Sequence, residues 1–351
     1  MIERICHIGP ALSVQGGISS VLISYKKLFA LSDKHFISSY NGSFIKSLPR
    51  LLLVCFKIIF GAHLHFEFYQ IHTSSYGSFF RKFLISLCLR LRKQKYTVHI
   101  HGSEFKKFCM ESAFILRYCI KSYFNHSSGV ICITPDMKDF LNQFLKNKEI
   151  LYFTLPNPCE NISIKPVNLE AHDLPVKIIF SGRYGKRKGV YDLIRAFDLA
   201  EFSLPVELHL FGDGEIDLVR AMASNSKKSK DIYVSYWIPH KDYLEILSSY
   251  DFLVLASYAE TFGMSLVEAM GYGLPVISTN VDAIPYVVED KKSGFLIQPG
   301  DIEALIQAMI TLVHHKALRV KMGKAGWEKA SQEFSGVVIQ KKIEAIYMDL
   351  K

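Results

Sequence analysis

Short runs of β-branched and aromatic residues alternate with segments of helical periodicity along the chain, and this alternation limits the fold more than any other feature. In the first half we predict strands at Ile5–Ile8, Lys34–Ser39, His63–Phe66, Thr97–His101 and Val130–Thr134. Between them we predict helices such as Ile18–Leu31 and Phe79–Leu91. Strands separated by helices form a parallel sheet with helices on both faces. The first half is therefore predicted to be a doubly wound α/β domain.

The alternation is interrupted once and then resumes. Residues 155–175 hold four prolines and show no clear period, so we predict a linker at 158–175. Beyond it, strands are predicted at Val176–Ser181, Val206–Phe211, Phe252–Leu255 and Val276–Thr279, with helices at Tyr191–Leu199, Lys241–Ser248 and Ser265–Met270. The predicted domains are 1–157 and 176–330, and 331–351 is a C-terminal helix that packs back toward the first domain. Two such domains would face each other across a cleft that binds ligands.

Length and composition agree with a folded two-domain protein. The 351 residues are 49% hydrophobic and 21% charged, which excludes a disordered or collagen-like chain and a nucleic-acid-binding tail. All seven cysteines lie in the first half, odd in number and without a C-x-x-C pair, so they are predicted to be reduced thiols of a cytosolic protein. The first ten residues are more like a strand than a signal peptide, and the apolar stretch Leu51–Phe60 is too short to span a bilayer.

The positive charge is concentrated in the first half. Residues 1–170 carry 21 basic and 10 acidic side chains, against 21 and 23 in the remainder. The predicted helix near 79–95 has cations at both of its ends, at Arg81 and Lys82 and again at Arg92 and Lys93. Such a helix could dock on anionic lipid, and the alternative is a buried helix with solvated flanking cations.

The strongest local pattern lies between Ala259 and Gly273, directly after an apolar strand. A small-residue turn leads into a helix, so the N–H groups of Gly263, Met264 and Ser265 meet at a helix start and can bind a phosphate. Glu260 precedes this helix and Glu268 lies inside it, where carboxylates can accept hydrogen bonds from sugar hydroxyls. The alternative is that both glutamates are ordinary solvated side chains.

Three further patterns lie where predicted strands end. The loop Gly182–Gly189 presents Arg183 and Lys188, which suit a diphosphate, although they could equally be solvated cations. The pair Gly16 and Gly17 follows the first strand and is either a tight turn or a place where backbone approaches a ligand. His101 ends a strand and is a site candidate, although a lone histidine is more often structural.

Several chemistries lack the patterns they need. The chain has no complete G-x-G-x-x-G fingerprint, no Walker loop, no H-E-x-x-H, no G-x-S-x-G elbow and no Asp-x-Asp pair. Hydride transfer, NTP hydrolysis by a P-loop, α/β-hydrolase chemistry and a metal site are therefore not predicted.

Taken together, these residues resemble the nucleotide-sugar-dependent retaining glycosyltransferases of the GT-B fold, specifically glycosyltransferase family 4. The likeness extends over nearly the whole chain and rests on Gly16-Gly17, His101-Gly102, Gly182-Arg183 with Lys188-Gly189, Gly212-Asp213-Gly214-Glu215, and Glu260 to Glu268 ending in Glu-Ala-Met-Gly-x-Gly-x-Pro-Val. A softer likeness, from His72-Thr73-Ser74-Ser75 and His101 to Phe105, is to the subset that builds bacterial surface polysaccharides.

The resemblance implies a role for each candidate residue. Arg183, Lys188 and the amides of 263–265 would bind the donor diphosphate, and Glu268 the ribose. Glu260 would contact the transferred sugar and His101 would line the acceptor side near the reacting carbon, and these two are the predicted catalytic residues. Gly16 and Gly17 are predicted to bind the donor. Where many relatives carry Gly-Gly-x-Pro-Glu, this chain has Asp282 to Tyr286, with Tyr286 replacing the acid, so the identity of the donor cannot be carried over.

The expected function is transfer of a hexosyl unit from a UDP- or GDP-type nucleoside diphosphate sugar to a lipid-linked saccharide. The resemblance places this reaction in the synthesis of capsule, O-antigen or exopolysaccharide, at the inner face of the cytoplasmic membrane. No cofactor is required, although Mg²⁺ could accompany the diphosphate loosely, and nucleic acid is not an expected partner. The rivals are an epimerase or phosphorylase of the same fold, and a non-catalytic nucleotide-sugar-binding scaffold subunit of a polysaccharide assembly complex.

Overall fold

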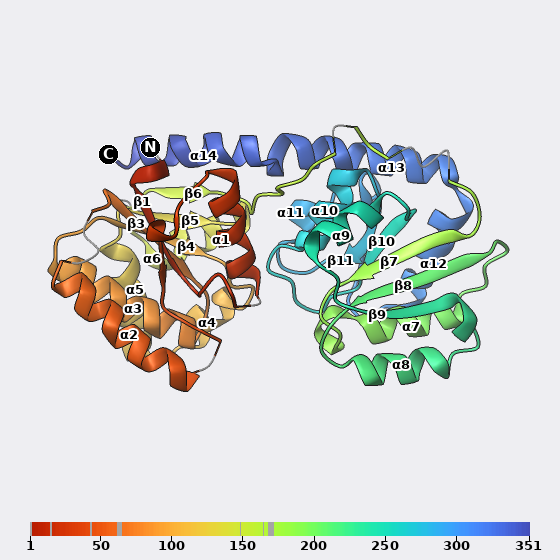
Figure 1. Cartoon of the computed structure of the whole chain (residues 1–351), viewed down its shortest axis with the longest axis horizontal. Coiled ribbons are helices and arrows are strands. Elements are labelled where there is room, and N and C mark those ends of the chain that lie inside the picture. Colours follow the sequence, from red (N-terminus) through yellow and green to blue (C-terminus); the bar gives the residue numbers. More distant parts are fainter. Residues whose placement is uncertain are drawn as a thin grey trace. The chain divides into compact units, whose positions relative to one another are not determined.

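The structure is a computed structural model that describes residues 2–14, 16–42, 44–61, 65–147, 149–163, 165–167 and 172–351. The chain divides into two units (Figure 1). The first unit is formed by Met1–Glu160 together with Gly336–Lys351, and the second by Asn161–Ser335. Each unit contains one six-stranded parallel sheet, so the prediction of two doubly wound α/β domains is confirmed.

The sheet of unit 1 has the strand order β2-β1-β3-β4-β5-β6. Its strands are β1 (Ile5–Gly9), β2 (Phe36–Ser38), β3 (Phe68–Thr73), β4 (Tyr96–Ile100), β5 (Gly129–Cys132) and β6 (Tyr152–Thr154). Four of them, β1, β3, β4 and β5, are buried along their whole length, as expected for parallel strands covered on both faces.

Helices cover both faces of this sheet. They are α1 (Gly17–Leu28), α2 (Phe44–Ile59), α3 (Gly77–Leu91), α4 (Phe105–Glu111), α5 (Phe114–Asn125), α6 (Pro135–Leu145) and, from the far end of the chain, α14 (Gly336–Asp349). Helix α14 contributes Ile339, Ile343 and Tyr347 to a core that also contains Val21 of α1 and Phe68 of β3. Residues more than 250 positions apart thus share one core.

The sheet of unit 2 has the order β12-β11-β10-β7-β8-β9. Its strands are β7 (Val176–Ser181), β8 (Val206–Gly212), β9 (Ile232–Tyr236), β10 (Phe252–Leu255), β11 (Val276–Thr279) and β12 (Gly294–Ile297). Its helices are α7 (Val190–Leu199), α8 (Ile216–Ser224), α9 (His240–Leu247), α10 (Met264–Tyr272), α11 (Ile284–Val287), α12 (Ile302–His314) and α13 (Lys316–Lys329). The chain adds β8 and then β9 on one side of β7, and it then adds β10, β11 and β12 on the other side of β7.

One predicted strand is wrong. We predicted a strand at His63–Phe66, but β3 begins at Phe68, and residues 62–64 lie outside the described part of the chain. The stretch from His63 to Thr73 alternates polar and apolar residues almost without a break, so its pattern does not fix where pairing begins. The start of pairing is instead set by burial, because only the residues of β3 lie between β1 and β4.

The Pro-rich segment after residue 157 packs largely on unit 2. The N–H of Ser163 donates to Gly271 O (3.0 Å), that of Val167 to Tyr272 O (2.9 Å), and the Trp327 indole donates to Ser163 O (2.9 Å). At the other end, residues 330–334 form a short π-helix in unit 2 before α14 begins at Gly336.

Candidate functional site

The site residues predicted in the second half gather at the carboxyl edge of the unit 2 sheet. Strands β7 and β10 are neighbours, although the chain leaves β7 toward β8 and returns to β10 on the other side. Their two following loops therefore diverge at a switch point, where open parallel sheets characteristically bind ligands. One loop carries Arg183 and Lys188, and the other carries Glu260.

Close backbone packing fixes the first loop against the second. Lys186–Lys188 form a short 3-10 helix that ends at Gly189, which has a φ of 67°. A Cβ at Gly189 would lie only 1.8 Å from the carbonyl oxygen of Ala256, so only glycine fits there. Across the same contact, the N–H of Tyr258 donates to Arg187 O at 2.9 Å. The loop is thus held in shape by backbone contacts.

Lys188 and Glu260 form an ion pair between the two loops. The Lys188 ammonium donates to Glu260 Oε2, and the side chains are only 16% and 9% exposed. The backbone N–H of Glu260 donates to Asp282 Oδ2 (2.9 Å), which holds the main chain of the loop at this residue. A partly buried cation and anion are thus held side by side, where an incoming anion could replace the carboxylate on the lysine.

Helix α10 starts directly beyond this pair. Gly263 is its N-cap and has a φ of 78°, a conformation that glycine adopts without strain. The first intrahelical bonds are donated by Leu266 and Val267 to Gly263 O, so the preceding N–H groups of Met264 and Ser265 point out of the helix end. These donors and the helix dipole favour an anion at this position.

Glu268 has a partner that the sequence did not reveal. Its Oε1 lies 2.8 Å from His240 Nε2, at the start of α9. His240 borders the site and was not predicted, although it directly precedes a predicted helix. Asp282 belongs to the loop that we compared with the Gly-Gly-x-Pro-Glu pattern, but its contact with Glu260 was not predicted.

Arg183 lies in the same loop as Lys188, directly after β7. Its side chain is exposed, and its Cγ lies 3.1 Å from where a Cβ of Gly214 would stand, so its stem runs over the loop after β8. Tyr286, which replaces the acid of the related pattern, packs edge to face against Phe334 at 6.0 Å. Burial raises the pKa of Tyr286 to about 12, so its hydroxyl stays protonated at neutral pH.

The predicted residues of the first half belong to unit 1. Gly16 and Gly17 start α1 after β1, both are exposed, and no described atom lies within 4 Å of a Cβ placed on either of them. His101 follows β4 and is 5% exposed. Its Nε2 lies 2.9 Å from His72 Nδ1, and burial lowers the pKa of His101 to about 3, so the ring is neutral.

Three histidines meet at this edge of unit 1, although no metal site was predicted. One nitrogen each of His72, His99 and His101 lies within 4.8 Å of the others, and all three rings are buried. Nitrogens at such spacing are the donors that transition metals prefer. Metal ligation and hydrogen bonding between rings are therefore both geometrically open to this group.

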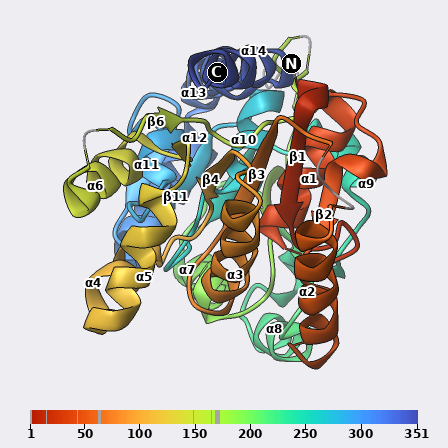
Figure 2. The same ribbon diagram turned by 90° about the vertical axis from the view of Figure 1, so that its left-hand side faces the viewer.

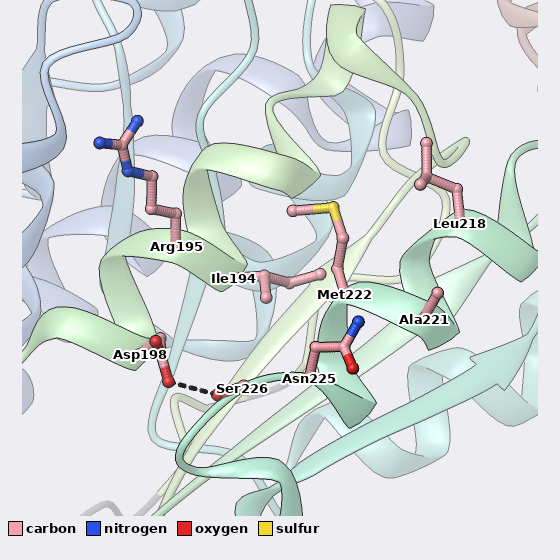
Figure 3. Close-up of a pocket in the computed structure, with 8 residues that line it drawn as sticks. All are labelled: Ile194, Arg195, Asp198, Leu218, Ala221, Met222, Asn225 and Ser226. Carbon is pink, nitrogen blue, oxygen red and sulfur yellow. Dashed lines mark hydrogen bonds between the residues drawn. The ribbon is translucent and has the colours of Figure 1, made fainter.

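A pocket of about 330 Å³ in unit 2 does not coincide with the predicted site. Figure 3 shows it between α7 and α8, with Ile194 and Met222 directed into it and Asp198 accepting a hydrogen bond from Ser226 (2.6 Å). None of the predicted site residues lines it. Among the described residues, no helix is both long enough and apolar enough to span a membrane.

Comparison with known proteins agrees with this geometry. Residues 163–329 match the family model of glycosyl transferases group 1. N-acetyl-alpha-D-glucosaminyl L-malate synthase of Bacillus anthracis is 29% identical over 178 residues, covering 49% of this chain and 45% of that protein. Lipopolysaccharide core biosynthesis glycosyltransferase LpsE of Rhizobium meliloti (strain 1021) is 27% identical over 218 residues, covering 61% and 62%. The match spans less than two thirds of either relative.

Solved structures show the fold of the whole chain. Sucrose-phosphate synthase from Thermosynechococcus elongatus matches with a TM-score of 0.79 and 17% identity, covering 99% of both chains. HepE from Anabaena, solved in complex with UDP, matches with a TM-score of 0.78 and 17% identity, covering 99% of this chain and 100% of that one. Residues 163–329 are thus similar to the group 1 glycosyltransferases, and the chain has the GT-B fold, as the sequence predicted.

Proposed function

We propose that the protein is a retaining hexosyltransferase that uses a nucleoside diphosphate sugar and extends a lipid-linked saccharide. The observation that carries this proposal is the Lys188–Glu260 pair beside the start of α10, at the switch point of the unit 2 sheet. It combines cationic and amide donors for a diphosphate with a carboxylate for sugar hydroxyls.

Donor binding would exchange partners within this pair. The diphosphate takes the place of Glu260 on the Lys188 ammonium and accepts hydrogen bonds from Arg183 and from the Met264 and Ser265 amides. The Glu260 carboxylate, released from Lys188, accepts hydrogen bonds from the sugar, while its backbone N–H still donates to Asp282. Glu268 accepts a hydrogen bond from a ribose hydroxyl, and His240 holds the Glu268 carboxylate in position.

The reaction breaks the bond between the anomeric carbon and the diphosphate oxygen and forms one to the acceptor oxygen on the same face. The acceptor proton passes to the departing diphosphate, so no carboxylate nucleophile is required. Lys188, Arg183 and the helix-start amides stabilise the charge that develops on the leaving group, which is the type of interaction that usually dominates such catalysis. Mg²⁺ carried by the diphosphate would add to this charge without a dedicated protein site.

The surface of unit 1 supports a lipid-linked acceptor and a peripheral location on the inner face of the cytoplasmic membrane. Helices α2, α3 and α5 lie side by side in Figure 2. They expose Leu48, Leu52, Phe56, Phe80, Leu84, Leu87, Leu91, Phe114, Ile115 and Tyr118, each by 39% or more. Exposed cations on the same helices and at their ends are Arg50, Lys57, Arg92, Lys93 and Arg117. Apolar side chains flanked by cations favour an anionic lipid surface.

One part of the membrane interpretation is wrong. We expected Lys82 to lie among the lipid-facing cations of α3, but its side chain is 1% exposed and points into unit 1. Arg81 is also partly buried, with its guanidinium 4.6 Å above the Tyr40 ring. We therefore propose that Arg92 and Lys93, at the other end of α3, supply the lipid-facing charge.

The relatives support the biological setting. LpsE is named for lipopolysaccharide core biosynthesis, and HepE was solved with UDP. We propose synthesis of a surface polysaccharide, such as capsule, O-antigen or exopolysaccharide, with UDP-sugars as the first donors to test and GDP-sugars next.

The test measures nucleotide binding and sugar transfer in the wild type and two matched variants. Lys188→Ala removes the paired cation, and Lys186→Ala removes an exposed lysine of the same loop. UDP or GDP should raise the melting temperature of the wild type and of Lys186→Ala but not of Lys188→Ala. Turnover of Lys188→Ala should fall about 10²–10³-fold, as for loss of one transition-state donor.

Two results would contradict the proposal. Unchanged nucleotide binding by Lys188→Ala would remove the diphosphate assignment. Nucleotide-sugar binding without hydrolysis or transfer to any saccharide acceptor would favour the scaffold subunit.

A further inference from the structure

Lys82 is a buried lysine without an acidic partner. It lies on α3 and is 1% exposed, and its ammonium donates to Ser39 Oγ. Ser39 is itself fully buried and donates onward to Gly9 O at 2.9 Å. No carboxylate among the described residues lies within ion-pair distance of Lys82. An ammonium has three donors, and this contact uses one of them.

Four buried histidines lie at the same edge of the sheet, and with Lys82 we call them the basic cluster: His7, His72, His99, His101 and Lys82. None is more than 5% exposed. His72 joins two of the rings, through its Nδ1 to His101 (2.9 Å) and through its Nε2 to His7 (3.2 Å). The Nε2 atoms of His7 and His99 have no hydrogen-bond partner within the described structure. Five bases are thus buried together without an acid.

Burial of these groups without a counter-charge is costly for their charged forms. Desolvation lowers the pKa of Lys82 to about 7, with a further contribution from the nearby Arg81. Lys82 in turn helps to lower the pKa of His72, after the larger effects of burial and of His101 and His99. An anion among these groups would supply the missing charge, because it stabilises each protonated base.

The location of the cluster suits a substrate. Lys82 contacts Ser39, which follows β2 and donates to Gly9 at the end of β1, so this contact lies at the carboxyl ends of the parallel strands. His101 follows β4 at the same edge. Two more unpartnered buried atoms, Ser75 Oγ before α3 and Arg81 Nε within it, belong to the same part of the chain. They add donors to the region that already contains the ammonium.

We propose that the basic cluster binds a phosphoryl group of a substrate through Lys82, and that this group belongs to the lipid diphosphate of the acceptor. The inference rests on the proposed function, which supplies a phosphate-bearing acceptor. It is independent of the donor site, since Lys188 and Glu260 belong to unit 2. A dication on His72, His99 and His101 is disfavoured because it would stand near Lys82 without a carboxylate to balance it.

The experiment measures equilibrium binding of two probes to the full chain, farnesyl diphosphate for the acceptor and UDP or GDP for the donor. Lys82→Met removes the ammonium at similar volume, and Lys34→Met removes an exposed lysine that precedes β2, at the amino edge of the same sheet. Lys82→Met should bind farnesyl diphosphate at least tenfold more weakly than the wild type and Lys34→Met, with nucleotide affinity unchanged.

Thermal unfolding separates this role from a structural one. If Lys82 serves substrate binding, Lys82→Met should melt at a higher temperature than the wild type, because an apolar side chain replaces a buried base. A lower melting temperature with unchanged diphosphate affinity would overturn the proposal and make Lys82 a tie between α3 and β2.

The remaining outcomes distinguish the alternatives. Weaker nucleotide binding by Lys82→Met, with farnesyl diphosphate unaffected, would overturn the acceptor assignment and identify the donor as the source of the phosphate. Binding of Zn²⁺ alone that requires His72 and is unaffected by Lys82→Met, without diphosphate binding, would overturn it in favour of a metal site. If nucleotides fail to bind the wild type while farnesyl diphosphate still requires Lys82, the proposed donor site fails and the basic cluster stands.

Discussion

At the scale of single residues, the loops at the carboxyl edge of unit 2 are shaped by backbone contacts that a side chain would block. Gly189 is the most demanding case, since a Cβ there would stand 1.8 Å from Ala256 O and the φ is 67°. Gly17 is the opposite case, with no described atom within 4 Å of an added Cβ. Packing thus requires glycine at position 189, whereas packing does not require glycine at position 17.

The two glycines therefore predict different responses to alanine. Gly189→Ala should lower the free energy of unfolding of unit 2 by roughly 2–5 kcal/mol, from the left-handed backbone and the overlap with Ala256. Gly17→Ala should change stability by less than about 1 kcal/mol, because alanine is favoured at a helix start over glycine. Urea unfolding of both variants measures this, and equal stability of the two would contradict the packing argument.

Residue types at the site could be predicted from the sequence, but their pairing could not. Lys188 and Glu260 were predicted as donor-site residues, yet nothing in the sequence indicates that they contact each other across 72 positions. The burial of Lys82 was missed for the same reason. From the sequence alone, a cation on an apolar helix is predicted to be solvated, and its burial becomes evident only when the neighbouring strands are known. Contacts between elements are set by the sheet order, which a single sequence does not contain.

At the scale of elements, the strands that we did not predict share one property, apart from β3, which we predicted at the wrong residues. β6, β9 and β12 are the outermost strands of their sheets, and each is only partly buried. An edge strand has one pairing partner and one exposed flank, so its sequence lacks the continuous apolar run of a central strand. Strands β10 and β11 lie inside the sheet, are fully buried and were predicted at their observed bounds.

The apolar face of α2 and α3 predicts lipid binding. Leu52→Ser combined with Phe56→Ser should weaken binding to vesicles that contain anionic lipid at least tenfold, since each buried apolar side chain contributes about 1.5–3 kcal/mol. Both side chains are more than half exposed, so the fold should remain intact. Vesicle sedimentation measures the effect.

The control is an apolar surface residue of the other unit. Leu199→Ser in unit 2 removes a side chain that is 52% exposed and should leave vesicle binding unchanged. Equal binding by all variants would show that the α2 and α3 face does not contact lipid.

At the scale of the whole molecule, the buried histidines make the two units respond differently to acid. Burial lowers the pKa of His7 and His101 to about 3, and those of His72 and His99 well below 6.5. Between pH 6.5 and about 3 the unfolded chain binds protons at these rings that the folded chain does not. All four lie in unit 1.

Unit 1 should therefore lose stability as pH falls below 6.5, by up to about 1.4 kcal/mol per pH unit for each histidine. Both tryptophans, Trp237 and Trp327, belong to unit 2, so tryptophan fluorescence follows that unit and far-ultraviolet circular dichroism follows both. Urea titrations at pH 7, 6 and 5 should show a circular dichroism transition that moves to lower urea ahead of the fluorescence transition. Coincident transitions at every pH would contradict this.

The return of α14 to unit 1 has a consequence for synthesis on the ribosome. Unit 2 is a single continuous stretch, Asn161–Ser335, and its last residue leaves the exit tunnel before any of α14 does. The core of unit 1 must wait for Ile339, Ile343 and Tyr347, although most of its strands are translated first. Unit 2 can therefore complete its core from one contiguous stretch, whereas unit 1 lacks part of its core until α14 has been translated.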